Sequence, residues 1–321
     1  MGIRVVRFEK DNLIQWGLVD ENTIITLRNE YYTLALFLEE GLTEARELMD
    51  QENVERLSFN EVTLLSPITK PARIICQGAN YSSHRAEAGL EIERPPFNMI
   101  FNKADSSLTG AYSDVIRPEH VKLLDYEIEL GLVISKQISG PIQITEQNLH
   151  EYVAGVVMVN DISARDIQLT QSQWLKGKSY RTFCPTGPYL YVLDSEESSY
   201  IHDLDIKLWV NDELRQSANT NQLLYKPEET LTELSGIIDL SPGDLVITGT
   251  TGGVALNLSH EEMAQLMNPI MPLGKKMNLL MESQSTSQKY LKDGDVIRSE
   301  IKSTDEKVNL GTQVNKVVPS K

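Results

Sequence analysis

Three acidic residues alternate along an otherwise apolar segment, LLDYEIELGLVIS, which covers residues 123–135. Asp125, Glu127 and Glu129 occupy every second position, so a single strand here would point all three carboxylates to one face. Carboxylates that share a buried face require a cation, and oxygen ligands suit a hard ion such as Mg²⁺ or Mn²⁺. A half-exposed edge strand with a polar face also explains the alternation. The pattern therefore indicates either a metal site or a polar strand face.

A further acid follows the next apolar run, VVMVNDISARD, at residues 156–166. An octahedral ion takes more ligands than two carboxylates, so Asp161 is a candidate third ligand. The alternative is an acid at the start of a helix over the following residues, where Asp and Ser are favoured. The spacing alone leaves both interpretations open.

The segment GANYSSHRAEAG, residues 78–89, contains a histidine and a glutamate three positions apart. If a helix begins at Ser82 or Ser83, His84 and Glu87 share one face of it. A glutamate that orients a histidine makes a base that can activate water. A surface pair on a loop is the alternative interpretation.

Two other segments offer weaker signals for ligand binding. Lys178 precedes an aromatic and proline-rich turn, although most lysines are simply solvated. The run ITGTTGGV, residues 247–254, has backbone N–H groups and Thr hydroxyls that can hold a carboxylate or phosphate. The sequence contains neither a Walker loop nor a Gly-x-Gly-x-x-Gly motif after a strand, so no nucleotide site is predicted.

The composition narrows the class of protein. The chain has 321 residues, 40% of them hydrophobic, and a formal net charge of −16, which argues against nucleic-acid or anionic-membrane partners. Cys76 and Cys184 form neither a disulfide framework nor a zinc pattern, and we expect buried reduced thiols. No run has the length of a signal or a membrane span, so we expect a cytoplasmic protein.

The periodicity predicts a small N-terminal domain over residues 1–66 and a larger domain over 67–321. In the first, a β-meander is predicted over 3–27 and a helix over 33–50, interrupted near Gly41. In the second, the predicted strands are 73–78, 98–103, 123–135, 153–163, 242–248, 293–301 and 310–318, with a hairpin over 208–216 and a helix over 164–177. Residues 257–290 are Met-rich and less regular, and they are predicted to be an insertion.

Seven motifs identify a family resemblance: QGANYSSHRAE, DYEIELGLVI, GVVMVNDISARDIQ, KGKSYRTFCPTGP, LWVNDELRQSANT, PGDLVITGTTGGV and LKDGDVIRSEI. They cover nearly all of residues 70–318 and lie in the order found in the fumarylacetoacetate hydrolase superfamily, which the chain resembles. The resemblance implies a mainly β, α+β fold. It is a mixed β-sandwich roll with a small N-terminal β domain, usually assembled as a homodimer.

The resemblance also implies roles for residues. The Mg²⁺ or Mn²⁺ ligands are Glu127, Glu129 and Asp161, and Asp125 then falls outside the ligand set, salt-bridged or hydrated. The catalytic residues are a dyad, His84 and Glu87, on a lid, and Lys178 beside the metal. The substrate contacts are Arg165, Gln168, Lys103 and Thr250. The chain departs from the family at Thr251, where the family usually has Pro, and in the insertion, which follows the same loop.

The resemblance implies an enzyme that acts on a 2-oxo acid. The expected reaction is hydrolysis of a C–C bond in an acylpyruvate- or fumarylpyruvate-type 2,4-dioxo acid through a metal-stabilised enolate, with His84 activating water. The same site could decarboxylate oxaloacetate or isomerise a hydroxymuconate-type diacid. A non-catalytic scaffold that has kept the fold is the alternative from another class.

Overall fold

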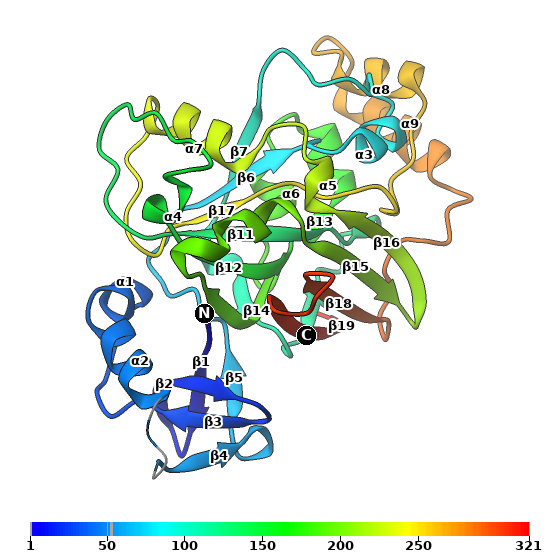
Figure 1. The fold of residues 1–321 in the computed structure, drawn as a ribbon. Coiled ribbons are helices and arrows are strands. Elements are labelled where there is room, and N and C mark those ends of the chain that lie inside the picture. Colours follow the sequence, from blue (N-terminus) through cyan, green and yellow to red (C-terminus); the bar gives the residue numbers. More distant parts are fainter. Residues whose placement is uncertain (1, 50, 52–53, 321) are drawn as a thin grey trace.

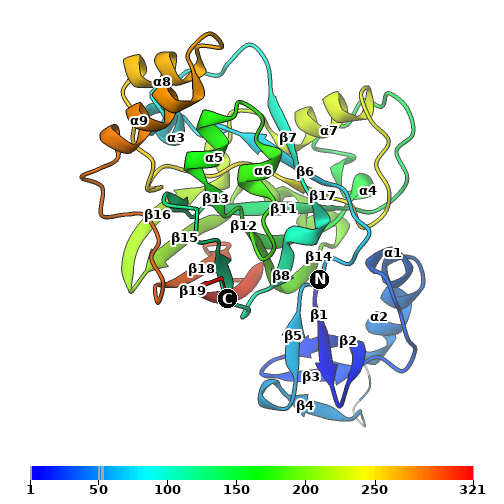
Figure 2. The ribbon, with the colours of Figure 1, turned by 180° about the vertical axis from the view of Figure 1, so that it is seen from behind.

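The computed structural model describes residues 2–49, 51 and 54–320, which form a mainly β, α+β fold (Figures 1 and 2). The strands are β1 Ile3–Lys10, β2 Leu13–Asp20, β3 Thr23–Thr26, β4 Arg56–Ser58, β5 Thr63–Leu65, β6 Ile74–Gly78, β7 Met99–Lys103, β8 Leu108–Gly110, β9 Val115–Arg117, β10 Leu124–Asp125, β11 Ile128–Ile134, β12 Val153–Asn160, β13 Ser163–Ala164, β14 Cys184–Val192, β15 Asp205–Val210, β16 Glu213–Asn219, β17 Leu245–Ile247, β18 Val296–Lys302 and β19 Asn309–Pro319. The helices are α1 Leu34–Leu36, α2 Leu42–Met49, α3 Ser82–Glu87, α4 Leu149–Tyr152, α5 Arg165–Thr170, α6 Leu175–Lys178, α7 Pro227–Ser235, α8 His260–Met267 and α9 Leu273–Ser283.

A large mixed sheet carries the centre of the fold. Its strand order is β4-β3-β2-β1-β14-β12-β11-β17-β6-β7, with β5 paired to β1 and β8 paired to β14. Both faces of β11 are buried, because Leu130 and Leu132 pack into one hydrophobic core and Val133 packs into another. This double burial explains why the segment around the acidic residues is almost continuously apolar.

The N-terminal segment forms the predicted β-meander, β1 to β3. It shares the large sheet, because β1 pairs antiparallel with β14, with Ile3 opposite Val192 (Figure 1). The predicted helix forms α1, a wide π-helical turn at Phe37–Gly41 and α2, so it changes geometry where the interruption was predicted. Asp50, the last residue of that prediction, lies outside the described residues.

A second sheet, ordered β16-β15-β18-β19-β9, packs beside the first, where β19 contacts β14. The predicted hairpin joins β15 to β16. Its turn residues Asn211 and Asp212 have φ angles of 50° and 65°, as a tight primed turn requires. The predicted strands near the C-terminus form β18 and β19.

The acid-bearing segment is not one strand, which corrects the prediction for residues 123–135. β10 pairs with β13, whereas β11 pairs with β12 and β17 in the large sheet. Between them, the Glu127 N–H donates to the side chain of Asn160 at 2.9 Å. The alternation of faces therefore does not continue to Asp125.

Two helical predictions also need correction. The helix predicted over residues 164–177 is two short helices, α5 and α6, separated by a turn. The insertion, predicted to be irregular, contains α8 and α9. A capping box begins α8: the Ser259 hydroxyl accepts from the Glu262 N–H at 3.2 Å, and the Glu262 carboxylate accepts from the Ser259 N–H at 2.7 Å. None of the helices in the described part of the chain is long and apolar enough to cross a bilayer.

Candidate active site and metal-binding carboxylates

The carboxylates of Glu127, Glu129 and Asp161 converge, as the family resemblance implied. One oxygen of each lies within 4.8 Å of the others, and all three side chains are buried. The β11–β12 pairing produces this geometry, because Asp161 directly follows β12 and its N–H donates to the Glu127 carbonyl at 2.8 Å. The acids at the start of β11 and just after the end of β12 thus lie together at one end of this strand pair.

The donor set fits a hard divalent cation. All the available ligand atoms are carboxylate oxygens, which Mg²⁺ and Mn²⁺ prefer. Burial, followed by the negative charges of Asp161 and Glu127, raises the pKa of Glu129 well above its usual range. One Glu129 oxygen accepts from the Gly249 N–H at 2.6 Å, which fixes this carboxylate toward the other two. A buried carboxylate in such surroundings is stabilised when a cation joins the cluster.

Two lysines reach into the carboxylate cluster. Lys178 Nζ lies 2.7 Å from Glu127 Oε2 and 2.6 Å from Asp161 Oδ2. Lys103 Nζ lies 2.5 Å from Asp161 Oδ1, and it also donates to the Lys178 carbonyl. The side chain of Lys103 is fully buried against Asp161 and is absent from the residues that line the pocket, and its contact with substrate stays a prediction.

Asp125 is salt-bridged, as predicted, and its place outside the ligand set stays a prediction. Its Oδ2 lies 2.8 Å from Arg165 Nε, and neither side chain is more than 2% exposed. Asp125 also accepts from the N–H groups of Ala255 at 2.8 Å and Leu256 at 3.1 Å. Arg165 Nη2 lies 2.5 Å from Glu127 Oε1. Asp125 therefore links the arginine that pairs with Glu127 to the segment after the glycine-rich loop.

These cations control ionisation at the floor of the site. Burial opposes the charge on Glu127, but Arg165 and Lys178 outweigh it and lower the pKa of Glu127. Burial likewise opposes the charge on Lys178, but Asp161 and Glu127 raise its pKa. The floor therefore keeps its carboxylate and its two cations ionised at neutral pH.

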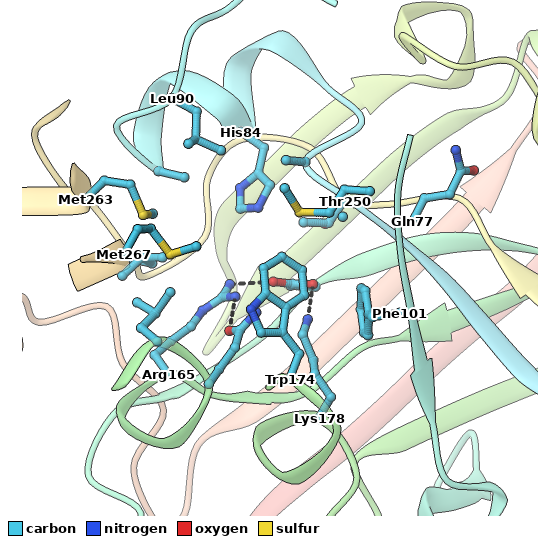
Figure 3. A pocket seen from close by; sticks show the side chains of 18 residues that line it. Gln77, His84, Leu90, Phe101, Arg165, Trp174, Lys178, Thr250, Met263 and Met267 are labelled. Atoms are coloured by element: carbon cyan, nitrogen blue, oxygen red, sulfur yellow. Dashed lines mark hydrogen bonds and ion pairs between the residues drawn. The ribbon is translucent and has the colours of Figure 1, made fainter. Parts of the chain in front are cut away.

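Most of the predicted site residues line one pocket (Figure 3). They are His84, Glu127, Arg165, Gln168, Lys178 and Thr250. His84 enters from α3 on one side, and Arg165 and Lys178 point in from α5 and α6 on the opposite side (Figure 3). The Gln168 side chain accepts from Arg165 Nη1 at 2.9 Å. The structure therefore places a histidine across from a charged floor.

His84 and Glu87 share α3, but Glu87 does not orient the imidazole as predicted. His84 Nδ1 is buried and has no hydrogen-bond partner among the described residues. Both Glu87 oxygens instead accept from the Gly253 N–H, at 2.9 and 2.8 Å. Burial lowers the pKa of His84 to about 4, so its imidazole is neutral at pH 7. Burial also raises the pKa of Glu87.

The glycine-rich loop, residues 247–254, is hydrogen-bonded to α3. Ser83 Oγ accepts from the Gly252 N–H at 3.0 Å and lies 3.3 Å from the hydroxyl of Thr251, the residue that departs from the family pattern. The Thr250 hydroxyl donates to the Ile128 carbonyl at 2.8 Å and accepts from Gln216 Nε2 at 2.8 Å. The hydroxyl of Thr250 is therefore engaged within the protein, although the residue lines the pocket.

Sequence reasoning missed the apolar residues of the pocket: Met99, Phe101, Trp174, Met263 and Met267. The Trp174 and Phe101 rings meet edge to face, with centroids 5.0 Å apart. A signal existed for some of them. Met99, Phe101 and Lys103 occupy every second position of β7, so they share one face of the strand. Trp174 lies four residues before Lys178, so these two share one face of a helix. Lys103 and Lys178 were both predicted site residues.

Comparisons with known proteins identify the family. The family profile described as Fumarylacetoacetate (FAA) hydrolase C-terminal matches residues 73–318. Oxaloacetate tautomerase Fahd2a, mitochondrial, from Rattus norvegicus is 36% identical over 268 residues, which cover 79% of this chain and 82% of the relative. The crystal structure of a probable 2-hydroxyhepta-2,4-diene-1,7-dioate isomerase from Mycobacterium abscessus is 29% identical, covers 100% of both chains and has a TM-score of 0.73.

A more distant structure shares the fold. Maleylpyruvate hydrolase from Sphingobium sp. SYK-6, solved with manganese(II) and pyruvate, is 24% identical, with 99% of this chain and 100% of that chain covered and a TM-score of 0.71. These similar proteins are thus named as a tautomerase, a probable isomerase and a hydrolase. The profile match alone spans far more than half of the sequence. This chain belongs to the fumarylacetoacetate hydrolase family.

Proposed function

We propose that the protein catalyses keto–enol tautomerisation of a 2-oxo acid, by moving a proton at the carbon next to the 2-oxo group. One observation carries this proposal. The neutral imidazole of His84 faces the charged floor of Arg165 and Lys178, and its Nδ1 has no partner in the described chain. Tautomerisation needs a group that exchanges one proton and a site that stabilises negative charge, and it needs no activated water.

The carboxylate cluster completes this proposal. Glu127, Glu129 and Asp161 would hold Mg²⁺ or Mn²⁺, and such an ion supplies Lewis-acid stabilisation of negative charge on the 2-oxo oxygen. Arg165 and Lys178 keep the floor attractive to an anionic substrate. His84 accepts the proton from the carbon, because its unprotonated form predominates at pH 7. The enolate oxygen then takes a proton from His84 or from solvent to give the enol, and the reverse sequence converts the enol to the keto form. Oxaloacetate is the first compound to test, since similar proteins are oxaloacetate tautomerases.

Hydrolysis of an acylpyruvate- or fumarylpyruvate-type acid is the second candidate, and the presence of His84 in the pocket also favours it. It requires a water that His84 activates with Glu87 as the orienting partner. Glu87 accepts from Gly253 instead, so the contact that hydrolysis needs is not formed in this arrangement. Decarboxylation of oxaloacetate and isomerisation of a hydroxymuconate-type diacid would use the same charged floor without activated water.

A parallel assay separates these reactions. The purified protein with Mn²⁺ is given enol-oxaloacetate, acetylpyruvate and fumarylpyruvate, with Mn²⁺ alone as the blank. We expect the ultraviolet absorbance of the enol to decay faster than in the blank, with oxaloacetate as the product by NMR, and His84→Asn to slow this about 100-fold or more. Release of pyruvate and a second acid from the acylpyruvates, without enol conversion, would instead establish a hydrolase. Release of CO₂ from oxaloacetate as the fastest reaction would establish a decarboxylase.

A further inference from the structure

The insertion over residues 257–290 supplies one wall of the pocket. Met263 and Met267 on α8 line it (Figure 3). Leu256, just before the insertion, also lines it. Met263 is 8% exposed, whereas Met267 is 53% exposed and therefore lies toward the mouth. Leu90 and Leu169 line the same pocket from the segment after α3 and from α5.

The wall is held in place by contacts at both ends of the insertion. The Leu258 N–H donates to the Glu87 carbonyl at 2.8 Å, and the His260 ring lies 3.1 Å from the Gly89 carbonyl. After α9, Gln284 Nε2 donates to the Asn257 carbonyl at 2.8 Å. In both ribbon views α8 and α9 lie beside α3, the helix that carries His84 (Figures 1 and 2). The insertion therefore packs against the helix that carries His84 and forms part of the site.

The charged residues of the pocket lie only at its floor. Among the described residues that line it, the charged ones are Glu127, Arg165 and Lys178. Arg165 Nε and Nη1 donate to Asp125 and Gln168, whereas Nη2 lies 2.5 Å from Glu127 Oε1 as an ion pair without the geometry of a hydrogen bond. Lys178 Nζ is likewise paired with two carboxylates. A second carboxylate that reached the wall formed by Met263 and Met267, away from this floor, would meet apolar side chains and no charged lining residue, which is unfavourable.

We infer that the α8 wall is a subsite for an uncharged apolar substituent, so that the protein selects 2-oxo acids with an alkyl or aryl group on carbon 3 over 2-oxo diacids. This inference rests on the proposed function and specifies the substrate class of the same site. Methionine side chains are unbranched and polarisable, so they adapt to apolar groups of different shape and contact aromatic rings favourably. Met263 and Met267 are then the specificity-determining residues.

Phenylpyruvate and oxaloacetate test the subsite, because they are pyruvate with a phenyl group or a carboxylate on the same carbon. Enolisation is measured for each as exchange of the carbon 3 hydrogens with D₂O by NMR, with Mn²⁺ present and the Mn²⁺ blank subtracted. We expect the exchange rate constant per enzyme to be about 10-fold or more higher for phenylpyruvate. Equal rates, or a preference for oxaloacetate, would overturn the inference.

Introduction of a positive charge at the mouth of the pocket provides the matched test. Met267→Lys places a cation at an exposed position of the wall, and we expect it to lower the phenylpyruvate-to-oxaloacetate ratio about 10-fold or more. Leu273→Lys is the control, because Leu273 lies in the same insertion, is 55% exposed and does not line the pocket. If the two variants keep the same ratio, the wall does not select the substituent.

A binding measurement separates failure of the subsite from failure of the proposed function. If neither compound exchanges hydrogen, tautomerisation is refuted, and the dissociation constants of the two compounds by calorimetry then decide the subsite. Tighter binding of phenylpyruvate that Met267→Lys reverses supports the subsite. Equal binding, or tighter binding of oxaloacetate to the unmodified protein, refutes it.

Discussion

Replacement of Asp125 by asparagine should destabilise the protein strongly, although Asp125 is not a predicted metal ligand. Its carboxylate is fully buried and has four donors: Arg165 Nε and the N–H groups of Tyr126, Ala255 and Leu256, all between 2.8 and 3.1 Å. Asparagine keeps the shape but removes the charge, and its amide N–H₂ faces groups that are themselves donors. The change therefore leaves Arg165 with one carboxylate in place of two.

The magnitude follows from this burial. Removing one partner of a buried ion pair costs roughly 3–5 kcal/mol, because the remaining charge is left without compensation. Glu127 still pairs with Arg165, which favours the lower part of that range. Natural proteins unfold with a free energy of about 5–15 kcal/mol, so the loss is a large fraction of the total.

Urea unfolding followed by circular dichroism measures this loss. The control is Asp20→Asn, which breaks a 2.8 Å ion pair with Arg56 whose side chains are 43% and 38% exposed. An exposed pair contributes at most about 1 kcal/mol, so the control should unfold close to the wild-type midpoint. If Asp125→Asn unfolded at the same urea concentration as Asp20→Asn, the argument that Asp125 holds Arg165 and the 255–256 segment in place would be wrong.

Three further outcomes are expected. Glu87→Ala should speed amide hydrogen exchange in α3, because the contact with the Gly253 N–H is lost. Glu87→Gln keeps an acceptor and should keep most of the protection of α3 from exchange. Equal protection in the two variants would argue against the contact. Mn²⁺ should raise the melting temperature of the wild type but not of Glu129→Gln, as measured by calorimetry, because binding to the folded state alone is stabilising; an equal rise in both would exclude the cluster as the binding site. Burial lowers the pKa of His84 to about 4, below the unfolded value of about 6.5, so the unfolded state binds the proton first and stability falls as the pH drops through this window. Urea unfolding at pH 7 and pH 4 should show a loss about 3 kcal/mol larger in the wild type than in His84→Asn, and identical losses would contradict a buried neutral imidazole.

The sequence pattern marked the acids of the site but did not join them. The period of two made Glu127 and Glu129 candidate ligands and the acid after β12 made Asp161 a third, while a polar strand face and a helix start stayed open. Only the family resemblance combined the three into one ligand set. The Asn211–Asp212 turn was predictable, since its sequence matches the turn geometry.

Long-range packing explains what the sequence did not predict. The break between β10 and β11 depends on Asn160, a side chain from another strand that takes the place of a main-chain partner. The true partner of Glu87 is a backbone N–H at Gly253, 166 residues away, which helix periodicity cannot identify. The Ser-x-x-Glu signal that begins α8 was present at Ser259, so the insertion could have been predicted as helical. The homodimer and the cytoplasmic location stay predictions.

Exchange of the carbon 3 hydrogens of a 2-oxo acid with D₂O tests the central claim most directly, because it reports enolisation whatever the substituent. Wild-type protein with Mn²⁺ should exchange these hydrogens faster than Mn²⁺ alone, while His84→Asn and Glu129→Gln should each fall about 100-fold or more toward that blank. A folded, Mn²⁺-binding wild-type protein that exchanged no faster than the blank, with pyruvate, phenylpyruvate and oxaloacetate alike, would contradict the account.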